Sequence, residues 1–143
     1  MTELARGACL PDTVIFACVH NAGRSQMAAA FFNQAADPSR ARALSAGTEP
    51  APHVHPVVVE TMREVGLDIG QNRPSRLTDA MTRGASLLIT MGCGDQCPVV
   101  PGLERDDWPL ADPKDRPIAE VRAIRDEIHA RVRDLVAARH WIP

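Results

Sequence analysis

Short hydrophobic runs alternate with stretches of helical periodicity along this chain of 143 residues. Four runs of strand character and four helical segments are separated by turn residues such as Gly, Pro, Asn and Asp. The predicted strands are 13–17, 41–45, 87–90 and 106–108, and the predicted helices are 25–36, 56–65, 78–83 and 118–136. Strands that alternate with helices are typical of a parallel sheet covered by helices on both faces.

The last predicted helix has one clear hydrophobic face, formed by Ile118, Val121, Ile124, Ile128, Val132, Leu135 and Val136. Its basic residues, which include Arg122, Arg125, Arg131 and Arg133, fall on the other faces. We expect these basic side chains to be solvated.

The length and composition indicate one domain, residues 1–143, with residues 1–12 as a loose leader. The net charge of −2 and the absence of Tyr argue against a nucleic-acid surface, and no basic patch, signal peptide or membrane span is evident. We therefore expect a cytoplasmic protein, in which four Cys residues would serve catalysis, redox exchange or metal binding rather than structural disulfides.

The loop 18–25, which joins the first strand to the first helix, is the strongest chemical signal. Cys18 and Arg24 stand near its two ends, with five residues between them. A helix N-terminus favours an anion, and here it would favour the Cys18 thiolate, the reactive form of a thiol, as would a Ser25 hydroxyl. The planar fork of Arg24 suits a tetrahedral oxyanion. The predicted substrate-binding residues are Val19, His20, Asn21, Ala22, Gly23, Arg24 and Ser25.

Within this loop, Asn21 is expected to take a left-handed conformation, and Ala22 and Gly23 leave room for backbone N–H groups. His20 has two open interpretations, a packed neutral ring or a group that orients the loop. The His53-x-His55 pair, at a helix start between two prolines, is expected to be structural or solvated rather than metal-binding.

Two further cysteines, Cys93 and Cys97, lie in a Gly/Pro-rich stretch with three residues between them. That spacing permits a disulfide and would also suit half of a zinc site, although no second ligand pair stands at a suitable spacing. No metal is predicted. Cys9 precedes the first strand and is expected to be a bystander.

These motifs together resemble the arsenate reductases built on the low-molecular-weight tyrosine phosphatase fold. The resemblance extends from Val14 to Val136 and is carried by the segments 18–28, 45–48, 91–98, 108–113 and 124–128. It implies a flavodoxin-like, three-layer α/β/α fold with four parallel strands. It also implies that the chain reduces arsenate to arsenite.

Carried over by position, the resemblance makes Cys18 the nucleophile, Arg24 an oxyanion ligand and Asp112, before Pro113, the general acid. Cys93 and Cys97 would then pass the oxidation of Cys18 outward by thiol–disulfide exchange. Asp106 and Asp107 compete with Asp112 for the role of acid, but the rigid Asp112-Pro113 step suits a fixed carboxyl better.

No bound cofactor is expected. An external thiol reductant is required, either thioredoxin or a glutaredoxin- or mycoredoxin-like protein, and phosphate and sulfate should compete with arsenate. Some relatives bind a monovalent cation near the loop, but the sequence 71–76 departs from their pattern, and Arg76 argues against a cation.

Three alternatives remain open. The first is an arsenate–small-thiol transferase, in which mycothiol or glutathione attacks the Cys18 adduct and a glutaredoxin-like partner follows. The second is a low-molecular-weight protein tyrosine phosphatase, although Lys114-Asp115-Arg116 replaces the aromatic residues that such enzymes carry after the Asp-Pro step. The third is an oxyanion sensor without turnover.

Overall fold

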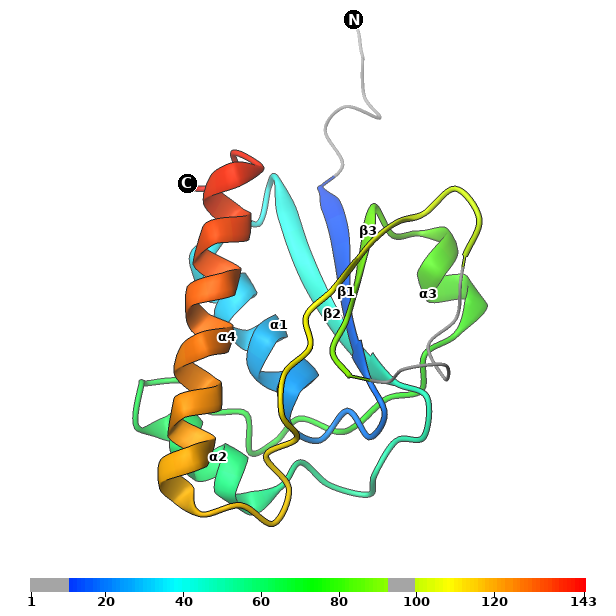
Figure 1. Cartoon of the computed structure of the whole chain (residues 1–143). Helices are drawn as coiled ribbons and strands as arrows, with labels where there is room; N and C mark the ends of the chain where they lie inside the picture. Colours follow the sequence, from blue (N-terminus) through cyan, green and yellow to red (C-terminus); the bar gives the residue numbers. More distant parts are fainter. Residues whose placement is uncertain (1–10, 93–99) are drawn as a thin grey trace, which may run out of the picture.

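A parallel sheet of four strands forms the centre of the computed structural model, which describes residues 11–92 and 100–143 (Figure 1). The strands are β1 (Asp12–Cys18), β2 (Ala41–Gly47), β3 (Leu87–Thr90) and β4 (Glu104–Asp107). Their spatial order is β2-β1-β3-β4, and every neighbouring pair is parallel. The predicted four-stranded parallel sheet between helical layers is confirmed.

Helices cover both faces of the sheet, as Figure 1 shows. α1 (Arg24–Ala35) packs on β1 and β2, α4 (Ile118–Ala138) packs on α1, and α2 (Pro56–Arg63) packs on α4. The short helix α3 (Asp79–Arg83) lies on the opposite side. Thr78 caps α3 by accepting a hydrogen bond from the backbone N–H of Met81, as expected for a helix that begins after Thr.

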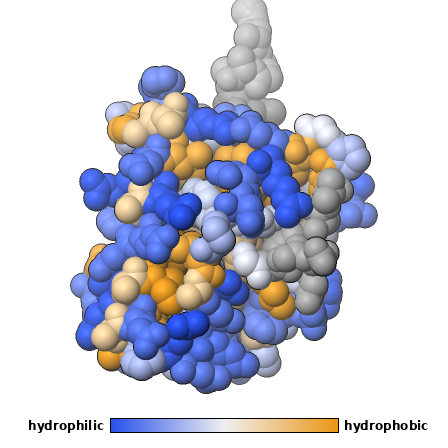
Figure 2. Space-filling view, in the orientation of Figure 1, coloured by the Kyte–Doolittle hydropathy of each residue, from blue (hydrophilic) through white to orange (hydrophobic). Residues whose placement is uncertain are grey.

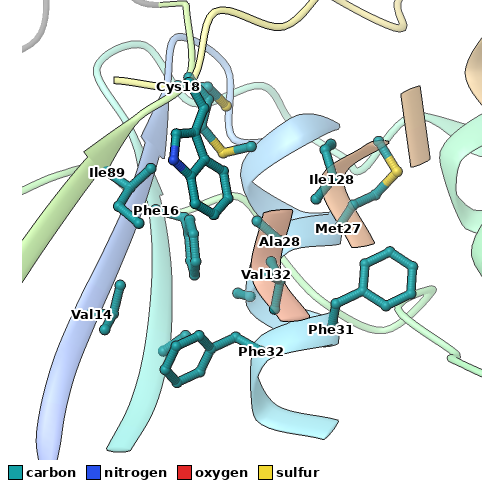
Figure 3. Packing of buried hydrophobic residues seen from close by; sticks show 14 of the residues in the cluster. Val14, Phe16, Cys18, Met27, Ala28, Phe31, Phe32, Ile89, Ile128 and Val132 are labelled. Carbon is teal, nitrogen blue, oxygen red and sulfur yellow. The ribbon is translucent and has the colours of Figure 1, made fainter. Parts of the chain in front are cut away.

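The alternation of side chains along β1 divides the core into two parts, because successive residues of a strand point to opposite faces. Val14, Phe16 and Cys18 belong to the larger cluster, on the side of α1 and α4, whereas Ile15 and Ala17 belong to a smaller one. Figure 3 shows the larger cluster, in which β1 meets the buried face of α1. The direction of Cys18 is therefore set by the register of a buried strand.

Large hydrophobic side chains are mostly buried in this arrangement, and each contributes about 1.5–3 kcal/mol relative to exposure. Phe16 packs against Phe32 and Trp108, with ring centroids 6.0 and 5.5 Å away. The face drawn in Figure 2 is predominantly hydrophilic, with smaller hydrophobic areas between the polar residues.

Several predicted boundaries require correction. β1 includes Asp12, whose N–H donates to the Arg40 carbonyl, so the predicted leader is too long. β2 continues to Gly47, and α2 ends at Arg63 because a turn follows it, with Gly66 at a φ of 84°. The helix over 24–35 is displaced by one residue from the prediction.

The predicted edge strand 106–108 is also displaced, because β4 ends at Asp107. Trp108 is buried after the strand, and its backbone N–H donates to the Thr90 carbonyl. The aromatic side chain thus packs into the core instead of lying in an edge strand whose residues are all exposed.

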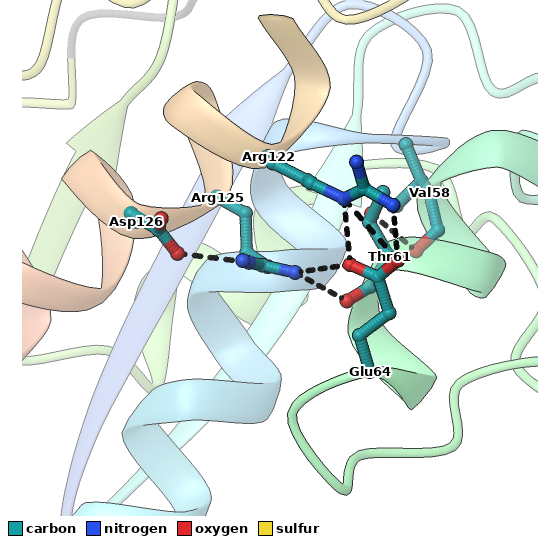
Figure 4. Close-up of polar contacts among 6 residues, drawn as sticks. All are labelled: Val58, Thr61, Glu64, Arg122, Arg125 and Asp126. Atoms are coloured by element: carbon teal, nitrogen blue, oxygen red, sulfur yellow. Dashed lines mark hydrogen bonds and ion pairs between the residues drawn. The ribbon is translucent and has the colours of Figure 1, made fainter. Parts of the chain in front are cut away.

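The prediction that the basic residues of α4 are solvated is wrong for Arg125, which is only 8% exposed. Its guanidinium donates to the Thr61 carbonyl and pairs with Glu64 and Asp126, as Figure 4 shows. Arg122 pairs with the same Glu64 carboxylate from a more exposed position. Burial of Arg125 is possible because α2 supplies the Thr61 carbonyl oxygen and Glu64, the residue that follows α2, supplies a carboxylate.

Candidate active site

The loop 18–25 begins at the carboxyl end of β1 and ends in the first turn of α1. Ligands of open parallel sheets bind at this edge, and the first N–H groups of a helix have no partner within the helix. The neighbouring strand β2 ends beside it, where the N–H groups of Thr48 and Glu49 donate to the carbonyls of Cys18 and Val19. The predicted strand–loop–helix context of Cys18 is therefore present.

Cys18 is buried, yet its sulfur lies among polar groups. The Cys18 Sγ is 2.9 Å from the Ser25 Oγ and accepts a hydrogen bond from the Asn21 backbone N–H at 3.3 Å. Hydrogen bonds donated to sulfur favour the thiolate over the thiol. This environment suits a nucleophile and differs from a purely hydrocarbon site.

Asn21 has a φ of 52°, so the predicted left-handed conformation is confirmed. Its side chain donates to the Ser25 Oγ at 2.7 Å and accepts from the Ser75 N–H at 2.8 Å. A fully buried residue with both ends of its amide bonded holds the strained turn in one conformation.

Arg24 lies at the start of α1 and is 7% exposed. Its Nη1 donates to the Leu110 carbonyl at 3.0 Å, and its Nη2 lies 3.7 Å from the Asp112 carboxylate. The structure thus brings together Arg24 and Asp112, which are far apart in sequence. The Asp112 side chain is 44% exposed and has access to solvent at the edge of the loop.

Three glycines allow these segments to approach one another. A Cβ on Gly47 would lie 2.6 Å from the Val19 carbonyl oxygen, and one on Gly23 would lie 2.7 Å from Pro113. A Cβ on Gly92, whose φ is 86°, would lie 2.4 Å from the Arg24 Nη1. Gly23 therefore seats the Asp112-Pro113 step on the loop, and Gly92 leaves space for the guanidinium.

The two histidines nearest the loop have mainly positioning contacts. The His20 Nδ1 lies 3.1 Å from the Glu49 carbonyl, which supports the interpretation that His20 orients the loop. The His55 N–H donates to the Ala22 carbonyl. Partial burial lowers the pKa of His55, against the opposing charge of Asp112, so its ring is neutral near pH 7. His53 is exposed.

Asp106 and Asp107, the competing candidates for the acid, have other partners. Asp107 accepts from the Thr90 hydroxyl, and Asp106 accepts from the Trp108 indole N–H at 3.2 Å. Arg76 donates to the Thr48 carbonyl beside the loop. Of the predicted site residues, Cys93 and Cys97 lie outside the described residues, as does Cys9.

Over residues 11–92 and 100–143, no group of three or more His, Cys, Asp or Glu side chains is arranged to hold a metal ion. Within the same ranges, none of the helices combines the length and apolarity that crossing a bilayer requires.

The model of one protein family, described as low molecular weight phosphotyrosine protein phosphatase, matches residues 13–140. The chain belongs to this family. The match extends from β1 to the end of α4 and includes every described residue of the candidate site.

Relatives within this family are named arsenate reductases. The thioredoxin-dependent arsenate reductase of Corynebacterium glutamicum has a TM-score of 0.79 and 41% identity, with 92% of this chain and 63% of that chain covered. The arsenate reductase of Staphylococcus aureus strain Newman is 34% identical over 121 residues, which are 81% of this chain and 89% of the relative.

A third relative is described as an arsenate reductase in the phosphate binding state. Its structure has a TM-score of 0.73 and 28% identity, and it covers 89% of this chain and 98% of the relative. The resemblance inferred from the sequence motifs is confirmed by these relatives. This chain spans less than two thirds of the length of the Corynebacterium protein.

Sequence reasoning missed three residues that support the phosphatase-family loop from outside, namely Gln26, Asn72 and Ser75. Gln26 donates to the Asn21 carbonyl and side chain, and Asn72 donates to Gln26. Gln26 follows the loop directly and is an amide that stands just before the apolar run 27–32, which is a usable signal. For Asn72 and Ser75 the family resemblance indicated only that the segment 71–76 is near the loop, because their individual contacts depend on the path of the chain after α2.

Proposed function

We propose that this arsenate reductase of the low-molecular-weight phosphatase fold acts through a relay of three thiols, Cys18, Cys93 and Cys97. The supporting observation is the Cys18 sulfur, held beside the Ser25 hydroxyl at the start of α1. Arg24 and Asp112 lie next to each other at the same loop, which supports oxyanion binding and proton donation by adjacent groups.

In the first step, the Cys18 thiolate attacks arsenic, and one arsenate oxygen leaves with a proton from Asp112. Arg24 and the backbone N–H groups of the loop stabilise the remaining oxygens. Phosphate and sulfate, which have the same tetrahedral shape, are competing ligands. The relative in the phosphate binding state agrees with this expectation.

In the second step, the Cys93 thiolate attacks the Cys18 sulfur. The sulfur–arsenic bond breaks with its electron pair on arsenic, so As(V) becomes As(III) while two thiols become one disulfide. Cys97 then attacks Cys93, which releases the Cys18 thiolate and leaves a Cys93–Cys97 disulfide.

No bound cofactor is needed, because the electrons come from an external dithiol in a reducing compartment such as the cytoplasm. Thioredoxin is the proposed donor, since the Corynebacterium relative is described as thioredoxin-dependent. A glutaredoxin- or mycoredoxin-like protein with a small thiol is the competing donor.

Arsenate-dependent NADPH consumption with thioredoxin and thioredoxin reductase tests the relay. We expect Cys18→Ser, Cys93→Ser and Cys97→Ser to lose turnover, and the matched variant Cys9→Ser to keep it. Full turnover of Cys93→Ser or Cys97→Ser would remove that cysteine from the mechanism. Turnover only with mycothiol or glutathione would identify a transferase, and hydrolysis of an aryl phosphate without arsenate reduction would identify a phosphatase.

A further inference from the structure

A continuous series of hydrogen bonds leads from the Cys18 sulfur to the surface. Beyond Ser25 and Asn21 it passes through Gln26, which is 3% exposed, and ends at Asn72 on an exposed segment. The Gln26 Nε2 donates to the Asn21 carbonyl at 3.1 Å and to the Asn21 Oδ1 at 3.2 Å. The Asn72 Nδ2 donates to the Gln26 Oε1 at 3.2 Å.

Backbone groups fix the orientation of both side-chain amides in this series. The Ser75 N–H can only donate, so the Asn21 oxygen must face it and the Asn21 Nδ2 must face Ser25. The Asn21 carbonyl can only accept, so the Gln26 Nε2 faces it and the Gln26 oxygen faces Asn72.

The direction at Ser25 follows from the same reasoning. When Cys18 is a thiolate it carries no proton, so the Ser25 O–H is the donor to the sulfur 2.9 Å away while the Ser25 oxygen accepts from Asn21. If the Asn21 amide turned over, its oxygen would accept the Ser25 proton instead, and the sulfur would lose that donor. The orientation of one buried amide thus decides whether the nucleophile receives a hydrogen bond.

We propose that Gln26 and Asn72 are positioning residues, which raise the reactivity of Cys18 by locking the Asn21 amide and hence the Ser25 hydroxyl. Gln26 supplies a second donor to the Asn21 oxygen and also clamps the carbonyl of this left-handed residue. Asn72 holds Gln26 in the required orientation. This inference rests on the proposed role of Cys18 as nucleophile.

The segment that carries Asn72 is itself attached firmly to the loop. The Gly47 N–H donates to the Ser75 carbonyl at 2.8 Å, and the Leu77 N–H donates to the Gly47 carbonyl at 2.9 Å. Residues 75–77 therefore lie along the end of β2, next to the loop. Asn72 lies three residues before this attachment, and its own backbone N–H donates to the Ile69 carbonyl at 3.1 Å, so its backbone is bonded on both sides.

The test is the pH dependence of Cys18 alkylation by iodoacetamide, in the full chain with Cys9, Cys93 and Cys97 replaced by Ser. We expect Gln26→Met to raise the pH midpoint by about one unit and Asn72→Ala by about half a unit. Protection of Cys18 by inorganic phosphate should persist in both variants, because Arg24 and the loop N–H groups are unchanged. Arg24 and Asp112, the charged pair at the loop, are retained throughout.

The matched control is Asn33→Ala, which removes an amide that bonds α1 to β2 through both Ala43 backbone groups, without a contact to the series. We expect its midpoint to equal that of the parent. Three outcomes would overturn the inference. The midpoint could stay unchanged in folded Gln26→Met and Asn72→Ala, or it could rise equally in Asn33→Ala. The third is a rise that is accompanied by loss of phosphate protection. If Gln26→Met does not fold, Asn72→Ala decides, because residue 72 is exposed.

Alkylation reports on the Cys18 thiol whether or not the chain reduces arsenate. A chain that fails the NADPH assay can still show the expected shifts, and an active chain can lack them. The two proposals can therefore fail separately.

Discussion

Two buried arginines, Arg24 and Arg125, are almost equally hidden from solvent, at 7% and 8% exposure, yet the protein uses them differently. The Arg125 guanidinium makes hydrogen bonds of 2.8–2.9 Å to Thr61, Glu64 and Asp126. The Arg24 guanidinium makes one of 3.0 Å to the Leu110 carbonyl and lies 3.7 Å from the Asp112 carboxylate.

The difference shows what burial of a charge indicates. Around Arg125 the protein supplies oxygen ligands at hydrogen-bonding distance from two helices, so the site is complete and joins α2 to α4. Around Arg24 the carboxylate stands farther off, and the residue lies on a loop that ends at a helix N-terminus. The guanidinium of Arg125 is fully paired within the protein, whereas the surroundings of Arg24 agree with its proposed role as an oxyanion ligand.

The same substitution at the two sites should separate these roles, with the largest effect at the loop. Arg24→Lys keeps the charge but loses the fork, and we expect the rate of arsenate reduction to fall about 10²–10³-fold. The free energy of unfolding should change little, since one carbonyl contact is lost. Steady-state kinetics and urea unfolding measure both quantities, and a variant that loses stability but keeps its rate would contradict the assignment.

Gly92→Ala tests whether the position of Arg24, rather than its charge, is what counts. The new Cβ would lie 2.4 Å from the Arg24 Nη1, and we expect the rate to fall about 10-fold or more as the guanidinium is displaced. Gly102→Ala is the matched control, because Gly102 has nearly the same φ, 82°, with no atom within 4 Å of its Cβ. Both variants bear the backbone strain, so equal rates in the two would show that the contact with Arg24 is unimportant.

Arg125→Lys should have the opposite outcome to Arg24→Lys. We expect it to lower the free energy of unfolding by about 1–2 kcal/mol while the rate of the folded enzyme stays unchanged. Arg122→Lys is the matched control, since Arg122 contacts the same Glu64 from a side chain that is 44% exposed, and its loss should be within about 1 kcal/mol. Equal losses in urea unfolding would contradict the importance of burial.

The sequence predicted one of these arginines and not the other, for a physical reason. Arg24 belongs to a local pattern, a cysteine and an arginine between a strand and a helix, and the chain path over a few residues determines its place. Arg125 was expected on a solvated face of α4. That prediction failed because its burial depends on Thr61, which lies in α2, and on Glu64, which follows α2. Only the packing of α2 on α4 brings these groups together.

The same distinction applies to the rest of the molecule. Three strands and the helices follow from apolar runs and periodicity, so the sheet and its layers were predicted from sequence, with errors at the element ends. The edge strand β4 (Glu104–Asp107) has only charged, exposed residues, and its prediction was displaced by two residues at its start. Within the candidate site, Asn21 was predicted with its left-handed turn. Asn72 and Ser75 were not predicted. Their hydrogen bonds to Gln26 and Asn21 join residues that are 46 and 54 positions apart, and no local pattern specifies such contacts.

The smallest effect that we predict concerns the pH dependence of the Arg125 site. Hydrogen bonds from Arg122, then from Arg125, lower the pKa of Glu64 from 4.5 to about 2, although partial burial opposes this shift (Figure 4). Because the folded-state pKa lies below the unfolded value, the stabilisation by Glu64 is fully present above pH 4.5 and is lost as the pH falls toward 2. Glu64→Gln should therefore flatten the decrease of stability over that interval, measured by urea unfolding at several pH values.

A double-mutant comparison makes this last prediction specific to one arginine. In the Glu64→Gln background, Arg125→Lys should cost less stability than it does in the wild type, because one of its charged partners is already gone. Arg24→Lys, which belongs to the other site, should have the same effect in both backgrounds. The contrary result is a coupling free energy between Glu64 and Arg24 as large as that between Glu64 and Arg125. The two buried arginines would then belong to one electrostatic unit and could not be compared as separate sites.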